Sequence, residues 1–246
     1  MRVTVIASGS KGNATLIETE KHNILIDAGL GYLTVRKRLN KTLPEIDIIL
    51  ITHVHDDHIK GLTSFIKRYK PLIYTKSPEI FEKTLYDNIY IEDNYLDENL
   101  EIDFFPLSHD TTCYGIKVKE NNKELVYITD TGFIHEKVIK KIKNKDFYIL
   151  ESNHDEEMLR NSRYPFYLQQ RIRGDKGHLS NEMAASYIKK IIGNNTSYLV
   201  LAHLSEENNN PGIALKNAIN ALEETDSKLK GLFIAKQDEP LESIEV

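Results

Sequence analysis

Residues 52–58 (THVHDDH) place three imidazoles and two carboxylates within seven positions. They follow residues 46–51, an apolar run rich in β-branched side chains that predicts a buried strand. Alternate side chains of an extended backbone point the same way, so His53 and His55 share a face. A following turn can bring Asp57 and His58 toward them. Neutral imidazole and carboxylate are ligands of zinc, manganese and iron. We therefore predict a metal site here rather than a solvated histidine-rich loop.

The elements around this cluster indicate an α/β protein. After the cluster, apolar residues recur at helical spacing, at Ile59, Leu62, Ile66 and Tyr69. The cluster therefore lies where a strand gives way to a helix, and α/β folds place their sites at such strand ends. Five further predicted strands also end at side chains that can bind or orient a ligand, namely Asp27, His109, Asp130, Glu151 and His203.

Composition restricts the classes of protein that fit. The chain has 246 residues, 40% hydrophobic and 28% charged, which is ordinary for a soluble globular protein. Its net charge of −5 gives no overall attraction to nucleic acid, so such binding needs a local basic patch. One cysteine, Cys113, excludes an internal disulfide and fits a reducing compartment. We find no signal peptide pattern and no apolar run near the ~20 residues of a membrane helix. We predict a cytoplasmic protein that does not enter a membrane.

The pattern His-x-His-x-Asp-His at residues 53–58 resembles the signature of the metallo-β-lactamase superfamily. The resemblance implies an α/β (α+β) fold, a four-layer αββα sandwich, with residues 1–246 as one hydrolase domain and two divalent metal ions, Mn²⁺ or Zn²⁺, between its halves. It implies that one ion is bound by His53, His55 and His109, the other by Asp57, His58 and His203, and both by Asp130. Asp27 is expected to orient the histidine ligands rather than to bind metal.

Three other segments resemble the nuclease branch of that superfamily, notably the tRNA 3′-processing endonucleases. They are the strand ending at Glu151, the Gly-His-x-Ser start of a helix at residues 177–180, and the segment that begins at His203. In that branch the histidine before the helix contacts the scissile phosphate and a glutamate orients it, and these roles fall on His178 and Glu151. A helix N-terminus also favours an anion. The alternative is that His178 is only the neighbour of a helix cap.

Additional motifs narrow the resemblance to the bacterial YycJ (WalJ) family. They include SGSKGN at residues 8–13, ESNHD at 151–155, GHLSN at 177–181 and HLSEENN at 203–209. The resemblance implies a DNA-acting 5′-to-3′ exonuclease linked to DNA mismatch repair, with Ser10 in a loop beside the metals. Asn153 and His154 are candidate substrate contacts, although His154 could instead brace the loop around the site.

A basic stretch from residue 160 to 176 favours a polyanionic substrate. It holds five basic residues against one acidic residue, with Tyr164, Phe166 and Tyr167 among them. Basic groups beside aromatic rings can hold a single strand by phosphate contacts and base stacking, although charge runs are often only solvated. The candidate substrate contacts here and at the following helix start, where Ser180 or Asn181 can act as the cap, are Arg171, Arg173, Ser180 and Asn181.

Together these observations predict a dinuclear-metal phosphodiesterase that acts on nucleic acid, with DNA favoured over RNA. Water activated by the ions and oriented by Asp57 would attack phosphorus, and His178, held by Glu151, would protonate or stabilise the leaving oxygen. The alternative enzyme is a metal-dependent hydrolase of a small ester, thioester or lactone. A metal-binding scaffold without activity would require the loss of an expected ligand, and none is missing. The sequence leaves the oligomeric state open.

Overall fold

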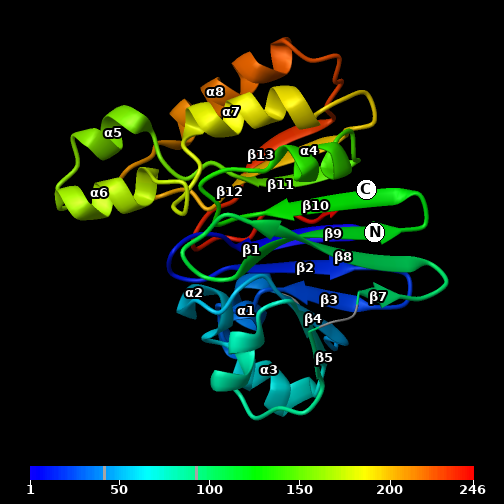
Figure 1. Ribbon diagram of the computed structural model, residues 1–246. Helices are drawn as coiled ribbons and strands as arrows, with labels where there is room; N and C mark the ends of the chain where they lie inside the picture. The colour runs from blue at the N-terminus through cyan, green and yellow to red at the C-terminus, as the bar shows by residue number, and fades with distance from the viewer. Residues whose placement is uncertain (41–42, 92–93) are drawn as a thin grey trace.

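The computed structural model describes residues 1–40, 43–91 and 94–246 of the chain. Two seven-stranded sheets pack face to face, and helices cover the outer face of each sheet (Figure 1). The predicted four-layer αββα sandwich is therefore confirmed. Within the described residues, no helix combines the length and apolar character needed to cross a membrane.

The first sheet has the strand order β14-β1-β2-β3-β4-β5-β6. Its strands are β1 (Arg2–Ala7), β2 (Ala14–Glu18), β3 (Asn23–Ile26), β4 (Ile48–Ile51), β5 (Leu72–Thr75), β6 (Ile89–Tyr90) and β14 (Ile244–Glu245). Strands β1 to β3 pair antiparallel, whereas β3 to β6 pair parallel. The helical segments on this side are α1 (Tyr32–Leu39), α2 (Asp56–Ile59), α3 (Leu62–Tyr69) and the short η1 (Pro78–Glu82).

The second sheet repeats this plan in the order β13-β12-β11-β10-β9-β8-β7. Its strands are β7 (Tyr95–Leu96), β8 (Leu100–Leu107), β9 (Cys113–Glu120), β10 (Lys123–Ile128), β11 (Phe147–Glu151), β12 (Tyr198–Ala202) and β13 (Gly231–Ile234). Its outer face carries α4 (Glu136–Ile142), α7 (Asn181–Ile191) and α8 (Pro211–Glu223). The remaining helices, α5 (Glu156–Arg160) and α6 (Phe166–Arg173), project beyond the strand ends (Figure 1).

Strand β4 shows why the layers form. Its side chains alternate between two cores: Ile48 and Leu50 belong to the core between the sheets, and Ile49 and Ile51 to the core under the first set of helices. A strand buried on both faces must be apolar at every position, which explains the unbroken apolar run in the sequence. A third core lies under the helices of the second sheet.

The parallel strands of each sheet deliver polar residues to one edge. Asp27 follows β3, residues 52–58 follow β4, and Asp130 and His203 come soon after β10 and β12. Asp27, Asp130 and His203 all have positive φ values, of 58°, 59° and 56°. This left-handed conformation is uncommon outside glycine and is tolerated best by residues such as Asp, Asn and His. The chain thus turns sharply at three of the predicted site residues.

Candidate active site

Three histidines from two sheets form the first group at this edge. Nδ1 of His55 lies 3.1 Å from Nε2 of His53 and 3.4 Å from Nε2 of His109. Behind them, Nδ1 of His109 donates to the carbonyl of Gly177 at 3.3 Å, and Nδ1 of His53 lies 3.0 Å from the hydroxyl of Thr52. Because the His109 proton is directed away from the group, its other nitrogen presents a lone pair to the shared space. Converging imidazole lone pairs suit a cation.

A second group contains Asp57, His58 and His203. Oδ2 of Asp57 lies 3.5 Å from Nε2 of His58 and 3.7 Å from Nε2 of His203. Nε2 of His203 is buried and makes no hydrogen bond to any described residue. A buried ring nitrogen without a partner is costly unless something binds it.

Asp130 lies between the two groups. Its Oδ2 is 3.2 Å from Nε2 of His58, and one ligand atom each from Asp130, His53 and His58 lies within 4.8 Å of the others. The structure therefore brings together all seven residues predicted to bind metal and places Asp130 where the shared carboxylate was expected. The donor set fits divalent ions, because imidazoles and carboxylates are directed at one space from opposite sides.

Asp27 contacts His58 and Thr52 on the side away from the cavity. Its Oδ2 lies 2.7 Å from Nδ1 of His58, and its Oδ1 accepts hydrogen bonds from the backbone and hydroxyl of Thr52. Sequence reasoning missed the role of Asn13, whose Nδ2 lies 3.0 Å from Nε2 of His58 and 3.4 Å from Oδ2 of Asp57. Asn13 closes the SGSKGN motif, so that motif contained the signal.

Glu151 orients two histidines rather than one. Its Oε1 lies 2.8 Å from Nδ1 of His178, as predicted, and also 3.0 Å from Nδ1 of His203. Its Oε2 accepts hydrogen bonds from the backbone N–H groups of Thr131 and Leu179. Burial would raise the pKa of Glu151, but the charge and hydrogen bonds of His178 and His203 lower it to about 2. The buried carboxylate is therefore ionised, and its two oxygens contact two imidazoles and two backbone N–H groups.

The histidines fall into two electrostatic classes. Burial lowers the pKa of His53 well below its usual value, so this ring is neutral and able to bind a cation. Burial would also lower the pKa values of His58 and His203, but Asp27 and Asp130 raise the first well above its usual value, and Asp130, Asp57 and Glu151 raise the second to about 10. Protons and cations therefore compete for the second group.

A cavity of about 250 Å³ opens onto both groups. His55, His109, Asp57 and His203 line it together with His178, which is partly exposed. Residues predicted to contact substrate also line this cavity, namely Ser10 and Arg171. The far end of α6 therefore forms a wall of the site, because Arg171 belongs to that helix.

The structure does not bring three other predicted substrate contacts to the cavity wall. Asn153 is buried and donates to the carbonyl of His203 at 2.8 Å. Ser180 caps α7 by accepting from the N–H of Met183, and Asn181 donates to Asn209 at 2.8 Å. Because these side chains are engaged inside the protein, they hold the site in place from behind.

His154 and Arg173 also lie away from the cavity lining. His154 is buried, 1% exposed, and neither of its ring nitrogens forms a hydrogen bond with a described residue. Nη2 of Arg173 pairs with Glu156 at 3.0 Å. Of the two roles considered for His154, substrate contact and support of the loop around the site, its burial agrees with the second.

Asp110 is a site residue that sequence reasoning missed. Its Oδ1 lies 3.4 Å from Nε2 of His55 and 3.3 Å from Nε2 of His109, and its Oδ2 accepts from Nε of Arg171 at 2.9 Å. It thereby joins the first histidine group to α6. Its position directly after His109 in the sequence was the available signal.

Comparisons with known proteins identify the family and the fold of this chain. The family described as "Beta-lactamase superfamily domain" matches residues 22–204. Exodeoxyribonuclease WalJ of Streptococcus pneumoniae is 33% identical over 240 residues, covering 92% of this chain and 89% of that protein. Among solved structures, the metallo-beta-lactamase fold protein YhfI of Bacillus subtilis has a TM-score of 0.73 at 19% identity, with 98% of each chain covered. The short form of human tRNase Z has a TM-score of 0.67 at 19% identity, with both chains covered completely.

Proposed function

Because this chain belongs to the beta-lactamase superfamily and to the family of the exodeoxyribonuclease WalJ, we propose that it is a metal-dependent phosphodiesterase that degrades DNA. The observation that carries the proposal is the contact between Glu151 and His178, because His178 lines the same cavity as residues of the two candidate ligand groups. An acidic or phosphate-contacting imidazole beside a metal pocket is what hydrolysis of a phosphodiester requires.

We propose that the first ion is held by His53, His55 and His109, the second by Asp57, His58 and His203, and both by Asp130. Two divalent ions bound there would activate a water molecule and stabilise negative charge on the phosphate oxygens. Mn²⁺ and Zn²⁺ both accept this mixture of imidazole and carboxylate ligands. Asp27 and Glu151 fix the ring orientations of His58 and His203 from behind.

His178 is the proposed proton donor to the leaving oxygen. Its Nδ1 is engaged by Glu151, which leaves Nε2 for the cavity. Burial would lower the pKa of His178, but the charges of Glu151 and Asp130 and the hydrogen bond to Glu151 raise it above its usual value. This shift favours the protonated ring, which is the form that a general acid needs. Asp57, which also lines the cavity, would accept a hydrogen bond from the attacking water.

The proposed substrate path leads from the cavity along α6. Arg171 lines the cavity, and Phe166 and Tyr167 at the other end of the helix are each 74% exposed. Exposed aromatic rings near basic side chains can stack the bases of a single strand. This arrangement favours a DNA strand over a small ester, thioester or lactone.

The experiment that tests this function is digestion of end-labelled single- and double-stranded DNA and RNA by metal-stripped protein reloaded with Mn²⁺ or Zn²⁺. We expect DNA to be shortened from its 5′ end only when metal is present, and Asp57→Asn to lower the rate by at least about 100-fold. Asp56→Asn is the matched control, since Asp56 is exposed and belongs to none of the candidate ligand groups. Hydrolysis of nitrocefin or an acyl-glutathione without any cleavage of nucleic acid would overturn the proposal.

Three broader predictions accompany this function. We propose that residues 1–246 act as one hydrolase domain, that the protein works in the cytoplasm, and that it serves DNA repair. The single cysteine supports a reducing compartment. The relative WalJ is an exodeoxyribonuclease, which supports a role in DNA metabolism.

A further inference from the structure

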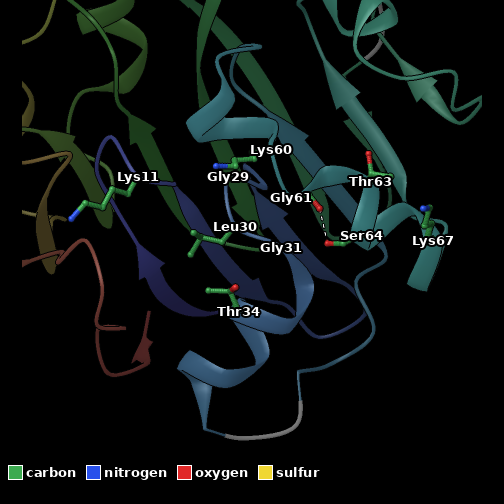
Figure 2. Close-up of a pocket in the computed structure, with 10 residues that line it drawn as sticks. All are labelled: Lys11, Gly29, Leu30, Gly31, Thr34, Lys60, Gly61, Thr63, Ser64 and Lys67. Atoms are coloured by element: carbon green, nitrogen blue, oxygen red, sulfur yellow. Dashed lines mark hydrogen bonds between the residues drawn. The ribbon is translucent and has the colours of Figure 1, made fainter.

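A second cavity has a volume of about 540 Å³, and Figure 2 shows the residues that line it. Its described lining contains three lysines, Lys11, Lys60 and Lys67, and no carboxylate. Thr34, Thr63 and Ser64 also line it, and the hydroxyl groups of the two threonines add hydrogen-bond donors to the positive charge of the lysines. We call it the lysine cavity.

One loop contributes to the linings of both the lysine cavity and the active-site cavity. Ser10 lines the active-site cavity, and the next residue, Lys11, lines the lysine cavity. Hydrogen bonds join this loop to two neighbouring segments. The backbone N–H of Asn13 donates to the carbonyl of Asp57 at 2.7 Å, and the carbonyl of Asn13 accepts from the N–H of Gly29 at 2.9 Å. A Cβ on Gly29 would lie 1.8 Å from the Asp57 carbonyl oxygen, so only glycine allows this close approach. A polymer that occupies one cavity could therefore continue into the other.

The segments that build the lysine cavity have an unusual charge distribution. Residues 28–44 and 59–78 contain nine Lys or Arg and no Asp or Glu, in a chain whose net charge is −5. Lys60 and Lys67 are exposed and have no ion-pair partner among the described residues, whereas Lys11 pairs with Glu206 at 2.7 Å. Two of the three ammonium groups are thus available for an external anion.

Helix geometry adds to this positive potential. The backbone N–H of Tyr32 donates to Oγ of Ser64 at 2.8 Å, and this hydroxyl donates to the carbonyl of Gly61 at 2.6 Å. The two bonds hold the N-termini of α1 and α3 together at the wall of the cavity. Helix N-termini carry partial positive charge and favour anions, so they reinforce the lysines.

We propose that the lysine cavity binds the phosphodiester backbone of the nucleic-acid strand whose scissile phosphate lies at the metal groups. This inference rests on the proposed function, because it assigns a further part of the same substrate. Phosphates repeat along a strand, so a strand that reaches past the Ser10–Lys11 boundary places its next charges against Lys60 and Lys67. A small ester would not extend that far and would not need these lysines.

The test measures fluorescence anisotropy of a labelled single-stranded DNA dodecamer with metal-stripped protein. The double variant Lys60→Gln/Lys67→Gln should bind about tenfold more weakly, and the slope of log affinity against log salt should fall by about 1.4, as expected for two lost phosphate contacts on a single strand. The matched control is Lys137→Gln/Lys140→Gln, two exposed lysines on α4 in the opposite outer layer, which should bind like the wild type. With metal restored, hydrolysis of bis(p-nitrophenyl) phosphate should be the same in all three proteins.

Each other outcome is informative. If the double variant bound DNA with unchanged affinity and an unchanged salt slope, the proposal that the lysine cavity binds the DNA backbone would be wrong, even if DNA cleavage confirmed the proposed function. If the protein bound DNA through these lysines but cleaved no nucleic acid with any metal, the binding role of the lysine cavity would stand and the proposed function would be wrong. If inorganic phosphate alone raised the melting temperature through the same lysines, and dinucleotides bound as tightly as the dodecamer, the cavity would be a phosphate site and the strand proposal would be wrong.

Discussion

Oδ2 of Asp27 lies 2.7 Å from Nδ1 of His58, and neither side chain has any exposed surface. Such a contact directs the proton of the imidazole toward the carboxylate and leaves the opposite nitrogen, Nε2, for the candidate metal groups. Asp27 therefore acts on the site through His58 without facing the cavity.

Replacing Asp27 by Asn should weaken metal binding by about 10- to 100-fold, because the amide cannot provide the same negative acceptor to His58. Metal affinity is measured by competition with a chromophoric chelator. Asp97→Asn is the matched control: Asp97 also pairs with a histidine, His22, at 3.2 Å, but outside the candidate ligand groups. Equal metal affinity in Asp27→Asn and wild type would contradict the supporting role.

The variant His178→Ala should lower kcat for DNA cleavage by about 100- to 10,000-fold while metal content stays at the wild-type level. The reason is that His178 is assigned to neither ion and shares Glu151 with His203. Its ring also lies with Asp130, Glu151 and His203 in a further group of potential ligand atoms within 4.8 Å of one another, so metal content must be measured together with activity. Metal analysis and single-turnover kinetics on the same preparation separate the two effects. His135→Ala, on an exposed histidine at the start of α4, is the control. Loss of metal together with activity would show that His178 acts as a ligand instead.

His154 should make the protein less stable in acid. Burial lowers the pKa of His154 from 6.5 to about 4, so between these values the unfolded chain binds a proton that the folded chain does not. The free energy of unfolding should therefore fall as pH falls from 6.5 toward 4, by about 3 kcal/mol from this residue. Urea unfolding of wild type and His154→Gln at several pH values, with chelator present, measures the difference. The same pH dependence in both proteins would be incompatible with a buried neutral imidazole.

The exposed rings at the start of α6 should contribute to single-strand binding. Stacking one base on an aromatic ring is worth about 1–3 kcal/mol, so Phe166→Ala/Tyr167→Ala should weaken binding of a DNA oligonucleotide by at least about fivefold. Phe81→Ala is the matched control, since that ring is 49% exposed but lies in η1 on the other half of the molecule. If both variants bind like wild type, α6 has no stacking role.

The fold and the first candidate ligands could be predicted because their signals are local, whereas His109, Asp130 and His203 were assigned from the family resemblance. Strand β4 is apolar at every position because both of its faces are buried, and the metal cluster follows it without a gap. The contacts that complete the site are not local. Glu151 reaches His203 across 52 positions and Arg171 reaches Asp110 across 61, and nothing in either segment alone reports these pairs.

Sequence reasoning was weakest for polar residues in loops. Asn153, Ser180 and Asn181 have side chains that can contact a substrate or the protein itself, and the direction is set by packing that motifs do not describe. The lysine cavity was missed for a related reason. Lys60 and Lys67 lie close together in the sequence, but Lys11 comes from a distant loop, and the residues of the α1 segment that complete the lining join them only in the folded chain.

Both sheets contribute to the candidate metal groups: His53, His55, Asp57 and His58 follow β4, whereas His109, Asp130 and His203 follow strands of the second sheet. Neither half of the chain therefore contains a full set of ligands. An ion bound there would act as a reversible cross-link between the two halves of the fold. The two halves also contact each other directly near the site, because the backbone N–H of His203 donates to the hydroxyl of Ser8. Without bound metal, the protein would therefore lose folding stability as well as catalytic activity.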